Sequence, residues 1–427
     1  MKIKIGDKNV DHVKILYYIV VFYVLLLSGS VIQYSAMSEL GNINSVLTII
    51  IGITYLIRHR NKIGKIKKNI SDLFIMCGGL GLLIIIIIWN NFSFLVGYIN
   101  TYCLILMPWL ICKIVKFDEF INAYIKFMFF LAVVSLILYE MPDLLAVLPI
   151  KIDVITSRWD YNYYIFYATF KEQIYDVFKR NIGMFWEPGM YQGFVVFAMM
   201  YVAAKGNSLK NIIIYEAVMF ATILTIQSST GFILMFPIII IIILNFVPPE
   251  WKKLQIVVSV IAIAAVLFLL LNPDFIISVL EGVAPGIANK IRVDDNGGSM
   301  GTRFYGLLID VYLTIKHPLG IGMLQIDTYR DNVAGLFRYI VDGSNINTTF
   351  SMMLYYGIVP GILYLILMIK GCFNFFDKKL VAILAIMVLL IIINTEPHYM
   401  TLFFTVIFMY FEQYKRINVN NPVSVST

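Results

Sequence analysis

Charged side chains are scarce in this sequence: Asp, Glu, Lys and Arg make up 14% of its 427 residues, whereas 60% are hydrophobic. That balance excludes a soluble globular domain, in which about 25% of residues are charged. Cysteine is rarer still, and Cys77, Cys103 and Cys112 fall inside apolar runs, which excludes a framework of external disulfides. We find no tandem repeat and no His, Cys or acidic cluster with metal-ligand spacing, so we expect no metal and no other cofactor.

Apolar runs of membrane length fill most of the chain instead. A helix needs about 20 apolar residues to cross a bilayer. The runs therefore predict an all-α polytopic integral membrane protein, with about twelve transmembrane helices in a single membrane domain over residues 1–427. The predicted spans are 15–36, 43–57, 72–89, 94–112, 121–139, 188–204, 211–227, 231–246, 254–271, 346–369, 380–394 and 398–411.

Lysine and arginine are distributed unevenly between the predicted loops. With both termini in the cytoplasm, the inner loops carry most of the 33 Lys and Arg, and the short outer turns at 37–42, 90–93 and 395–399 carry none. This follows the positive-inside rule and predicts a multi-pass protein whose termini are both cytoplasmic. The net charge of +7 is then explained by the lysines and arginines of the cytoplasmic loops. We therefore expect no nucleic-acid partner.

Two predicted outer loops are long, 140–187 and 272–345, and we expect both to contain helices. The first is crowded with aromatic residues. One interpretation is an interfacial helix among the lipid headgroups, and the other is a platform on which sugar rings stack. These residues are Trp159, Tyr161, Tyr163, Tyr164, Phe166, Tyr167, Phe170, Tyr175 and Phe178.

The second long loop, 272–345, is predicted to contain an amphipathic helix that begins near Ser299 and ends before Pro318. Its apolar face holds Phe304, Leu308, Val311 and Ile315, and its polar face holds Arg303, Asp310, Thr314 and His317. A long loop with structure of its own is usually functional.

Ionisable residues are nearly absent from the predicted spans, apart from Asp72 and His398 at the first position of a span. Lys126 and Glu216 are the other exceptions, and both lie near the cytoplasmic end of a span, where a long side chain can reach water. A proton- or sodium-coupled transporter needs such groups deep in the bilayer. The sequence therefore argues against that class and favours chemistry at the outer interface.

The first long loop ends in Arg180-Asn-Ile-Gly183-Met-Phe-Trp-Glu187-Pro188-Gly189. An arginine at the membrane boundary can hold a phosphate through two parallel N–H donors, and a glutamate there can accept a proton from a hydroxyl group. The alternative for Glu187 is a cap on the helix that begins at Pro188. Both interpretations of Glu187 stay open.

Four motifs in this order resemble those of bacterial O-antigen and exopolysaccharide polymerases. They are the segment 180–189, the segment Ser228-Ser-Thr230-Gly231, Arg303 with the following segment 317–322, and Asn345-x-Asn347 with the following segment 356–361. The resemblance covers the whole predicted topology and implies a GT-C-like polymerase architecture.

The resemblance implies a metal-independent glycosyltransferase at the outer face of the bacterial cytoplasmic membrane. It would transfer a growing glycan from undecaprenyl pyrophosphate onto a sugar hydroxyl of a second lipid-linked repeat unit, alongside a flippase and a chain-length regulator. The implied site residues are Arg180 and Arg303 as pyrophosphate clamps, Glu187 as the base, His317 and then His398 as further candidates for the base, and Asn345, Asn347, Ser228 and Thr230 as other substrate contacts. The alternatives are a solvated or headgroup-binding cation for Arg303, a charged cap on the carboxyl end of the predicted helix for His317, and helix caps for Asn345 and Asn347. Reserve cations, each with surface charge as its alternative, are Lys179, Arg292, Arg330 and Arg338.

Two positions depart from the family pattern. Ile346 stands where the related O-antigen ligases carry a histidine, which favours polymerase over ligase, and Ser229 stands where the serine-threonine motif has an arginine. A flippase for lipid-linked oligosaccharide is the alternative from another class, and it would be expected to have short loops on both sides and a cationic central cavity. The product is left open between O-antigen, capsule and exopolysaccharide.

Overall fold

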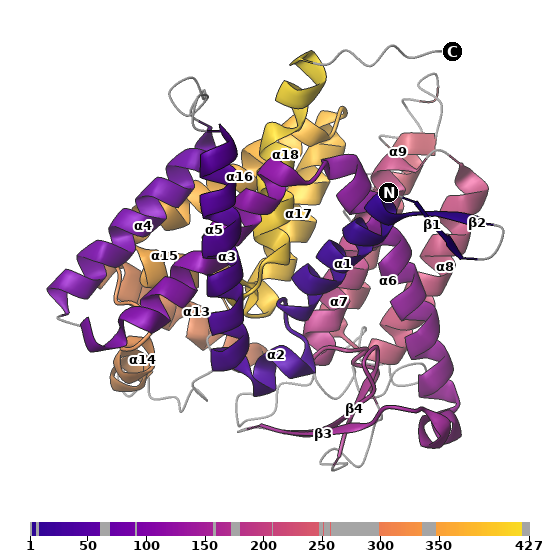
Figure 1. Ribbon diagram of the computed structural model, residues 1–427, viewed down its shortest axis with the longest axis horizontal. Helices are drawn as coiled ribbons and strands as arrows, with labels where there is room; N and C mark the ends of the chain where they lie inside the picture. The colour runs from indigo at the N-terminus through magenta and orange to yellow at the C-terminus, as the bar shows by residue number, and fades with distance from the viewer. Residues whose placement is uncertain are drawn as a thin grey trace. The chain divides into compact units, whose positions relative to one another are not determined.

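The computed structural model describes residues 2–5, 8–59, 69–89, 92–156, 159–171, 180–206, 208–246, 251, 257, 299–334 and 347–420. The described chain is mostly helical (Figure 1) and divides into two compact units. Seven described helices are long and apolar enough to cross a membrane, which confirms the class of helical membrane protein. The count of about twelve spans and the GT-C-like architecture stay predictions.

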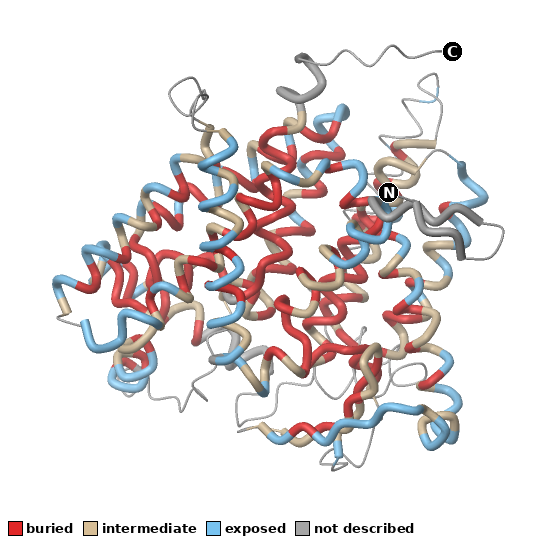
Figure 2. The backbone as a smooth tube through the Cα atoms, in the orientation of Figure 1, coloured by how far each residue is buried: buried red, intermediate tan, exposed pale blue. Residues whose placement is uncertain are grey.

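The first unit comprises Met1–Ser35, Asp118–Gly301 and Met387–Ile392. Most of the residues of its helix α7 are buried (Figure 2), and α7 packs against both α8 and α9. A helix that is apolar on all sides is a core helix. The elements of this unit are β1 (Lys2–Ile5), β2 (Lys8–Asp11), α1 (His12–Leu26), α2 (Val31–Ser35), α6 (Phe117–Glu140), η3 (Pro142–Val147), β3 (Ile152–Ile155), β4 (Asp160–Tyr163), β5 (Ala168–Phe170), α7 (Pro188–Lys205), α8 (Leu209–Ile226) and α9 (Ser229–Phe246).

The second unit comprises Ala36–Phe117, Thr302–Ile386 and Ile393–Thr427. Helix α16 is central to it and packs against α15, α18 and α4. The elements of this unit are α3 (Met37–His59), α4 (Ile70–Ile88), η2 (Phe92–Phe94), α5 (Leu95–Ile114), α13 (Ser299–Lys316), α14 (Ile326–Ala334), α15 (Thr348–Tyr356), α16 (Ile358–Phe375), α17 (Lys379–Thr395, apart from the residues in the first unit), η6 (His398–Met400) and α18 (Phe403–Asn420).

Two of the predicted spans are broken helices. The run 15–36 is interrupted between α1 and α2 at Gly29, and the run 346–369 is interrupted between α15 and α16 at Gly357. Both glycines have φ of +97°, a value that side chains with a Cβ rarely adopt. The prediction of one continuous helix in each run is therefore wrong. Most of the predicted span 254–271 lies outside the described residues.

The aromatic part of the first long loop forms a three-stranded antiparallel sheet in the order β3-β4-β5. The prediction of an interfacial helix here is wrong. Tyr161, Tyr163 and Tyr167 are also buried, so these three rings are closed to the stacking of sugars. The hydroxyl of Tyr161 donates to the carbonyl of Trp186 at 2.9 Å. This hydrogen bond holds the ring inside the protein and ties the sheet to the segment before α7. Tyr175 and Phe178 lie outside the described residues.

The predicted helix of the second long loop is confirmed as α13, and it ends at Lys316, before Pro318. Its polar face, however, is the buried one. Asp310 and Thr314 are buried, while Ile315 of the apolar face is 75% exposed. Asp310 can be buried because it has a buried partner, Arg330, in α14.

Candidate functional site

In the first unit, the segment before Glu187 fills the helix break at Gly29. The amide of Trp186 donates to the carbonyl of Gly29 at 3.0 Å, and the amide of Val31 donates to the carbonyl of Met184 at 3.1 Å. Backbone groups freed by a break in an apolar helix must find partners inside the protein. The motif segment supplies them, so the motif and the break form one local structure.

Asn181, which is not among the predicted site residues, holds this segment in place. Its side-chain amide donates to Ser135 and Thr225 at 3.0 Å each, and its oxygen accepts from the amide of Gly183 at 3.0 Å. Gly183 has φ of +54°, and a Cβ there would lie 2.9 Å from the ring of Tyr191. The Asn-x-Gly sequence that follows Arg180 in the motif is therefore also explained by local packing.

Arg180 precedes α7 in the sequence, and its side chain lies at the carboxyl end of α8. Its Nε donates to the carbonyl of Ile226 at 3.1 Å, and its Nη2 donates to the carbonyl of Gln227 at 3.2 Å. A cation at the carboxyl end of a helix is favourable because carbonyls there lack helical partners. A guanidinium has five N–H donors in a planar fork, the geometry that suits a phosphate. The clamp role of Arg180 stays a prediction.

Glu187 is in the N-cap position of α7, with extended backbone at φ −139° and ψ 151°. Its side chain makes no capping hydrogen bond to the first turn, and Pro188 removes one of the amides that would otherwise need a partner. The half-buried carboxylate is therefore not used as a side-chain cap. This weakens the structural alternative for Glu187 and leaves its role as a base a prediction.

Ser228 and Thr230 begin α9 beside the first turns of α7. The hydroxyl of Ser228 donates to the side-chain oxygen of Gln192 at 3.0 Å, and Thr230 is buried. The first unit thus gathers four predicted residues, Arg180, Glu187, Ser228 and Thr230, around the start of α7, the end of α8 and the start of α9. The order of the motifs predicts that these residues lie on the same side of the membrane. In the structure they lie near the same helix ends.

In the second unit, the segment 318–322 fills the helix break at Gly357. The amide of Ile358 donates to the carbonyl of Pro318 at 2.9 Å, and the amides of Ile321 and Gly322 donate to the carbonyl of Leu354 at 2.8 and 3.0 Å. A Cβ on Gly357 would lie 3.2 Å from a backbone oxygen of the same segment. Two motifs that are 30 or more residues apart in the sequence are therefore joined directly through backbone groups.

A buried ion pair lies between α13 and α14. The Nε of Arg330 is 2.9 Å from Oδ1 of Asp310, and its Nη2 is 3.4 Å from Oδ2. Burial raises the pKa of Asp310, and the charge and hydrogen bonds of Arg330 act in the opposite direction and favour the ionised carboxylate. Arg330 is 3% exposed, and the interpretation of this residue as surface charge is wrong.

His317 follows α13 and lies in a cluster of aromatic rings. Its ring centroid is 4.9 Å from that of Tyr329 and 6.3 Å from that of Trp89. Burial, together with the charge of Lys316, lowers its pKa, so the neutral imidazole predominates at pH 7. A neutral ring can accept a proton, whereas a cap for the α13 dipole needs the charged form. Its Nε2 is buried without a hydrogen-bond partner, and its role as a base stays a prediction.

The other predicted residues of the second unit are placed as follows. Arg303 lies in the first turns of α13, and its side chain is outside the described residues, as is the whole of Asn345. Asn347 is the N-cap of α15 and accepts from the amide of Phe350 at 3.1 Å, which is a structural use of its oxygen. His398 is fully buried in η6, its ring lies against Phe404, and burial lowers its pKa to about 3. The reserve residues Lys179, Arg292 and Arg338 lie outside the described residues.

Trp89, Tyr329 and the pairing of Asp310 with Arg330 are not predictable from the motifs. Asp310 was recognised as part of a polar face, but a helical periodicity does not reveal what that face meets. Among the described residues, no group of three or more His, Cys, Asp and Glu is placed to hold a metal ion. Comparison of the chain with family models, with curated proteins and with solved structures finds no match in any of the three.

Proposed function

We propose that this chain is a membrane-embedded glycan polymerase that acts on polyprenyl-pyrophosphate-linked oligosaccharides. The main support for this proposal is the structure at the two helix breaks. In each unit a motif segment fills the break of an apolar helix, and a predicted base flanks it: Glu187 directly follows one segment, and His317 directly precedes the other. Irregular backbone among apolar helices is tolerated where it is buried in protein or lines a water-filled cavity, and such breaks form binding sites in other membrane proteins.

The proposed reaction is the transfer of a glycan from pyrophosphate to a sugar hydroxyl. A hydroxyl oxygen of the acceptor repeat unit attacks the anomeric carbon of the donor glycan, and the bond from that carbon to the pyrophosphate oxygen breaks. The hydroxyl proton passes to Glu187, a general base. The electron pair leaves with the pyrophosphate, whose charge a clamping arginine stabilises. Pyrophosphate is a good leaving group, so the proposed mechanism is metal-independent.

The proposed enzyme has an expected place in the cell. The protein would act at the outer face of a bacterial cytoplasmic membrane, with both termini in the cytoplasm, beside a flippase that delivers the substrate and a regulator of chain length. The absence of the ligase histidine at Ile346 supports polymerase over ligase. A flippase is the alternative from another class, and the two long loops of the sequence, 140–187 and 272–345, favour an enzyme over it.

Arg303 gives the direct test of the clamp. The variant Arg303→Ala is expected to make no polymer while reaching the membrane in normal amount, because the leaving pyrophosphate loses its cationic partner. Arg303→Lys is expected to restore little, since an ammonium lacks the planar fork that binds two phosphate oxygens. The measurement is the surface-glycan ladder on a gel, with membrane protein quantified by immunoblot.

The matched control is Lys316→Ala, which removes a cation from an exposed position at the other end of the same helix. It is expected to give a normal ladder. Normal polymer from Arg303→Ala, at normal protein abundance, would remove Arg303 from the proposed site.

A further inference from the structure

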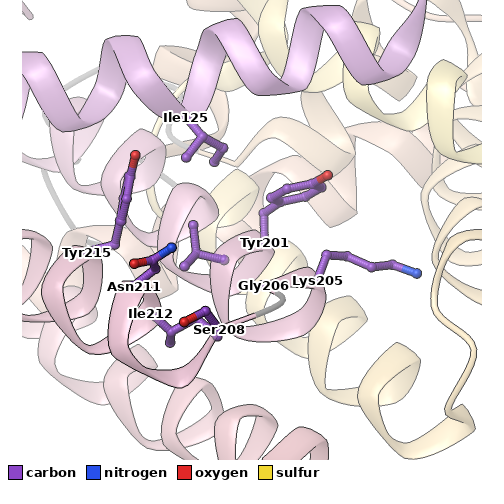
Figure 3. Close-up of a pocket in the computed structure, with 9 residues that line it drawn as sticks. Ile125, Tyr201, Lys205, Gly206, Ser208, Asn211, Ile212 and Tyr215 are labelled. Carbon is purple, nitrogen blue, oxygen red and sulfur yellow. The ribbon is translucent and has the colours of Figure 1, made fainter. Parts of the chain in front are cut away.

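A cavity of about 270 Å³ lies in the first unit where α7 turns into α8, beside α6. It is lined by Ile125 of α6 and by residues of the α7–α8 turn that include Lys205 and Tyr215 (Figure 3). At 1.5 Å per residue, the 18-residue helix α7 separates this turn from Glu187 by roughly 27 Å. The cavity therefore belongs to a different place from the candidate catalytic residues.

The lining of the cavity has an apolar body and a polar edge. Figure 3 shows Ile125 directed from α6 toward Asn211 and Tyr215 of α8, whereas the ammonium group of Lys205 extends away to one side. Its lining residues are apolar, polar or basic, and none is acidic. Such an arrangement suits a ligand with an apolar part and an anionic part.

The size of the cavity indicates that it holds part of a larger molecule. Pockets that enclose a whole small ligand measure about 300–1,000 Å³, which is more than this cavity offers. Next to it, α8 exposes Leu209, Ile213 and Ile214 at 47%, 58% and 48%, and both α6 and α8 are long and apolar enough to cross a membrane. The rest of the ligand would therefore continue along lipid-facing surface.

Two lysines stand at the ends of these helices. Lys205 is in the last turn of α7, and Lys210 is exposed in the first turn of α8. Basic residues at the end of a membrane helix attract the phosphate of anionic lipids, by about 1 kcal/mol for each Lys or Arg. We propose that this cavity is a binding site for one anionic phospholipid, with part of an acyl chain inside and the phosphate beside Lys205 and Lys210.

The experiment is native mass spectrometry of the purified full-length protein with added phosphatidylglycerol or phosphatidylcholine. Wild type is expected to retain phosphatidylglycerol in preference to phosphatidylcholine. Lys205→Gln is expected to bind phosphatidylglycerol about fivefold more weakly. The control Lys151→Gln, at an exposed position in the same unit, is expected to bind as wild type does.

A second variant tests the cavity separately from the charge. Asn211→Trp places a bulky ring in the cavity at an exposed helical position and is expected to lose the lipid with both lysines intact. An excess of inorganic phosphate is expected to leave the lipid bound. The proposal is overturned if the two lipids bind alike, if either variant binds as wild type does, or if phosphate alone displaces the lipid.

Discussion

Glu187→Gln is expected to reduce polymer formation by about 10²–10⁴-fold, the usual contribution of a positioned acid or base. Glutamine keeps the size and shape of the side chain but cannot take a proton from the attacking hydroxyl. The structure makes the test sharp, because the Glu187 side chain makes no capping hydrogen bond to α7 and its substitution should leave that helix intact. The readout is the rate of polymer formation from lipid-linked repeat units by the purified protein.

The matched control for Glu187 is Glu140→Gln. Glu140 is an exposed carboxylate at the end of α6 in the same unit, and its loss is expected to leave the rate unchanged. Size-exclusion elution and thermal stability should be the same for wild type and both variants. A Glu187→Gln protein that is folded and fully active would show that the carboxylate is not the base, and His317 would then be tested in the same way.

Asp310→Asn is expected to destabilise the second unit by about 3–5 kcal/mol, which is the typical effect of removing one partner of a buried ion pair. The loss is large because Arg330 is only 3% exposed, so water cannot take the place of the Asp310 carboxylate. Thermal unfolding in detergent, followed by the loss of the monodisperse elution peak, measures the effect. Polymer formation should fall with the amount of folded protein.

Two further variants separate the ion pair from general damage to these helices. Asp331→Asn removes an exposed carboxylate next to Arg330 and is expected to change stability by less than about 0.5 kcal/mol. The double variant Asp310→Leu with Arg330→Met replaces the pair by apolar side chains and is expected to regain most of the lost stability. If Asp310→Asn were as stable as Asp331→Asn, the pair would not hold α13 to α14.

The periodicity of the sequence was enough to locate most helices. The stretch before Pro318 was predicted as a helix from its 3.6-residue pattern, and α13 occupies that stretch. The pattern did not say which face is buried, because that depends on Arg330, twenty residues further along the chain. Only the tertiary structure shows that the polar face turns inward.

The sheet in the first long loop has a local signal in the sequence of its strand β4. In β4 the sequence Asp160-Tyr-Asn-Tyr163 alternates polar and aromatic residues, and both tyrosines of the strand are buried. Alternation of this kind is the pattern of a half-buried strand. The density of aromatic residues suggested a membrane interface, and it outweighed the short alternating run.

The helix breaks were harder to foresee. Gly29 and Gly357 stand in apolar runs, and glycine is common in membrane helices that remain continuous. At both breaks, segments far away in the sequence dock through backbone groups that bond to the ends of the gap, and a local glycine signal does not reveal such a partner. The order of the motifs predicted that Arg180, Glu187 and Ser228 would lie on the same side of the membrane, but it could not predict that Asn181 and Gly183 set the path of the segment between them.

The most direct test of the central claim is deletion of the gene in the cell that carries it, followed by electrophoresis of the surface glycan. The proposed polymerase predicts that the ladder of long chains disappears while single repeat units still reach the surface. Full-length polymer that stays attached to its lipid carrier would contradict this and indicate a ligase. Loss of every surface repeat, with lipid-linked single units retained inside the cell, would also contradict it and indicate a flippase.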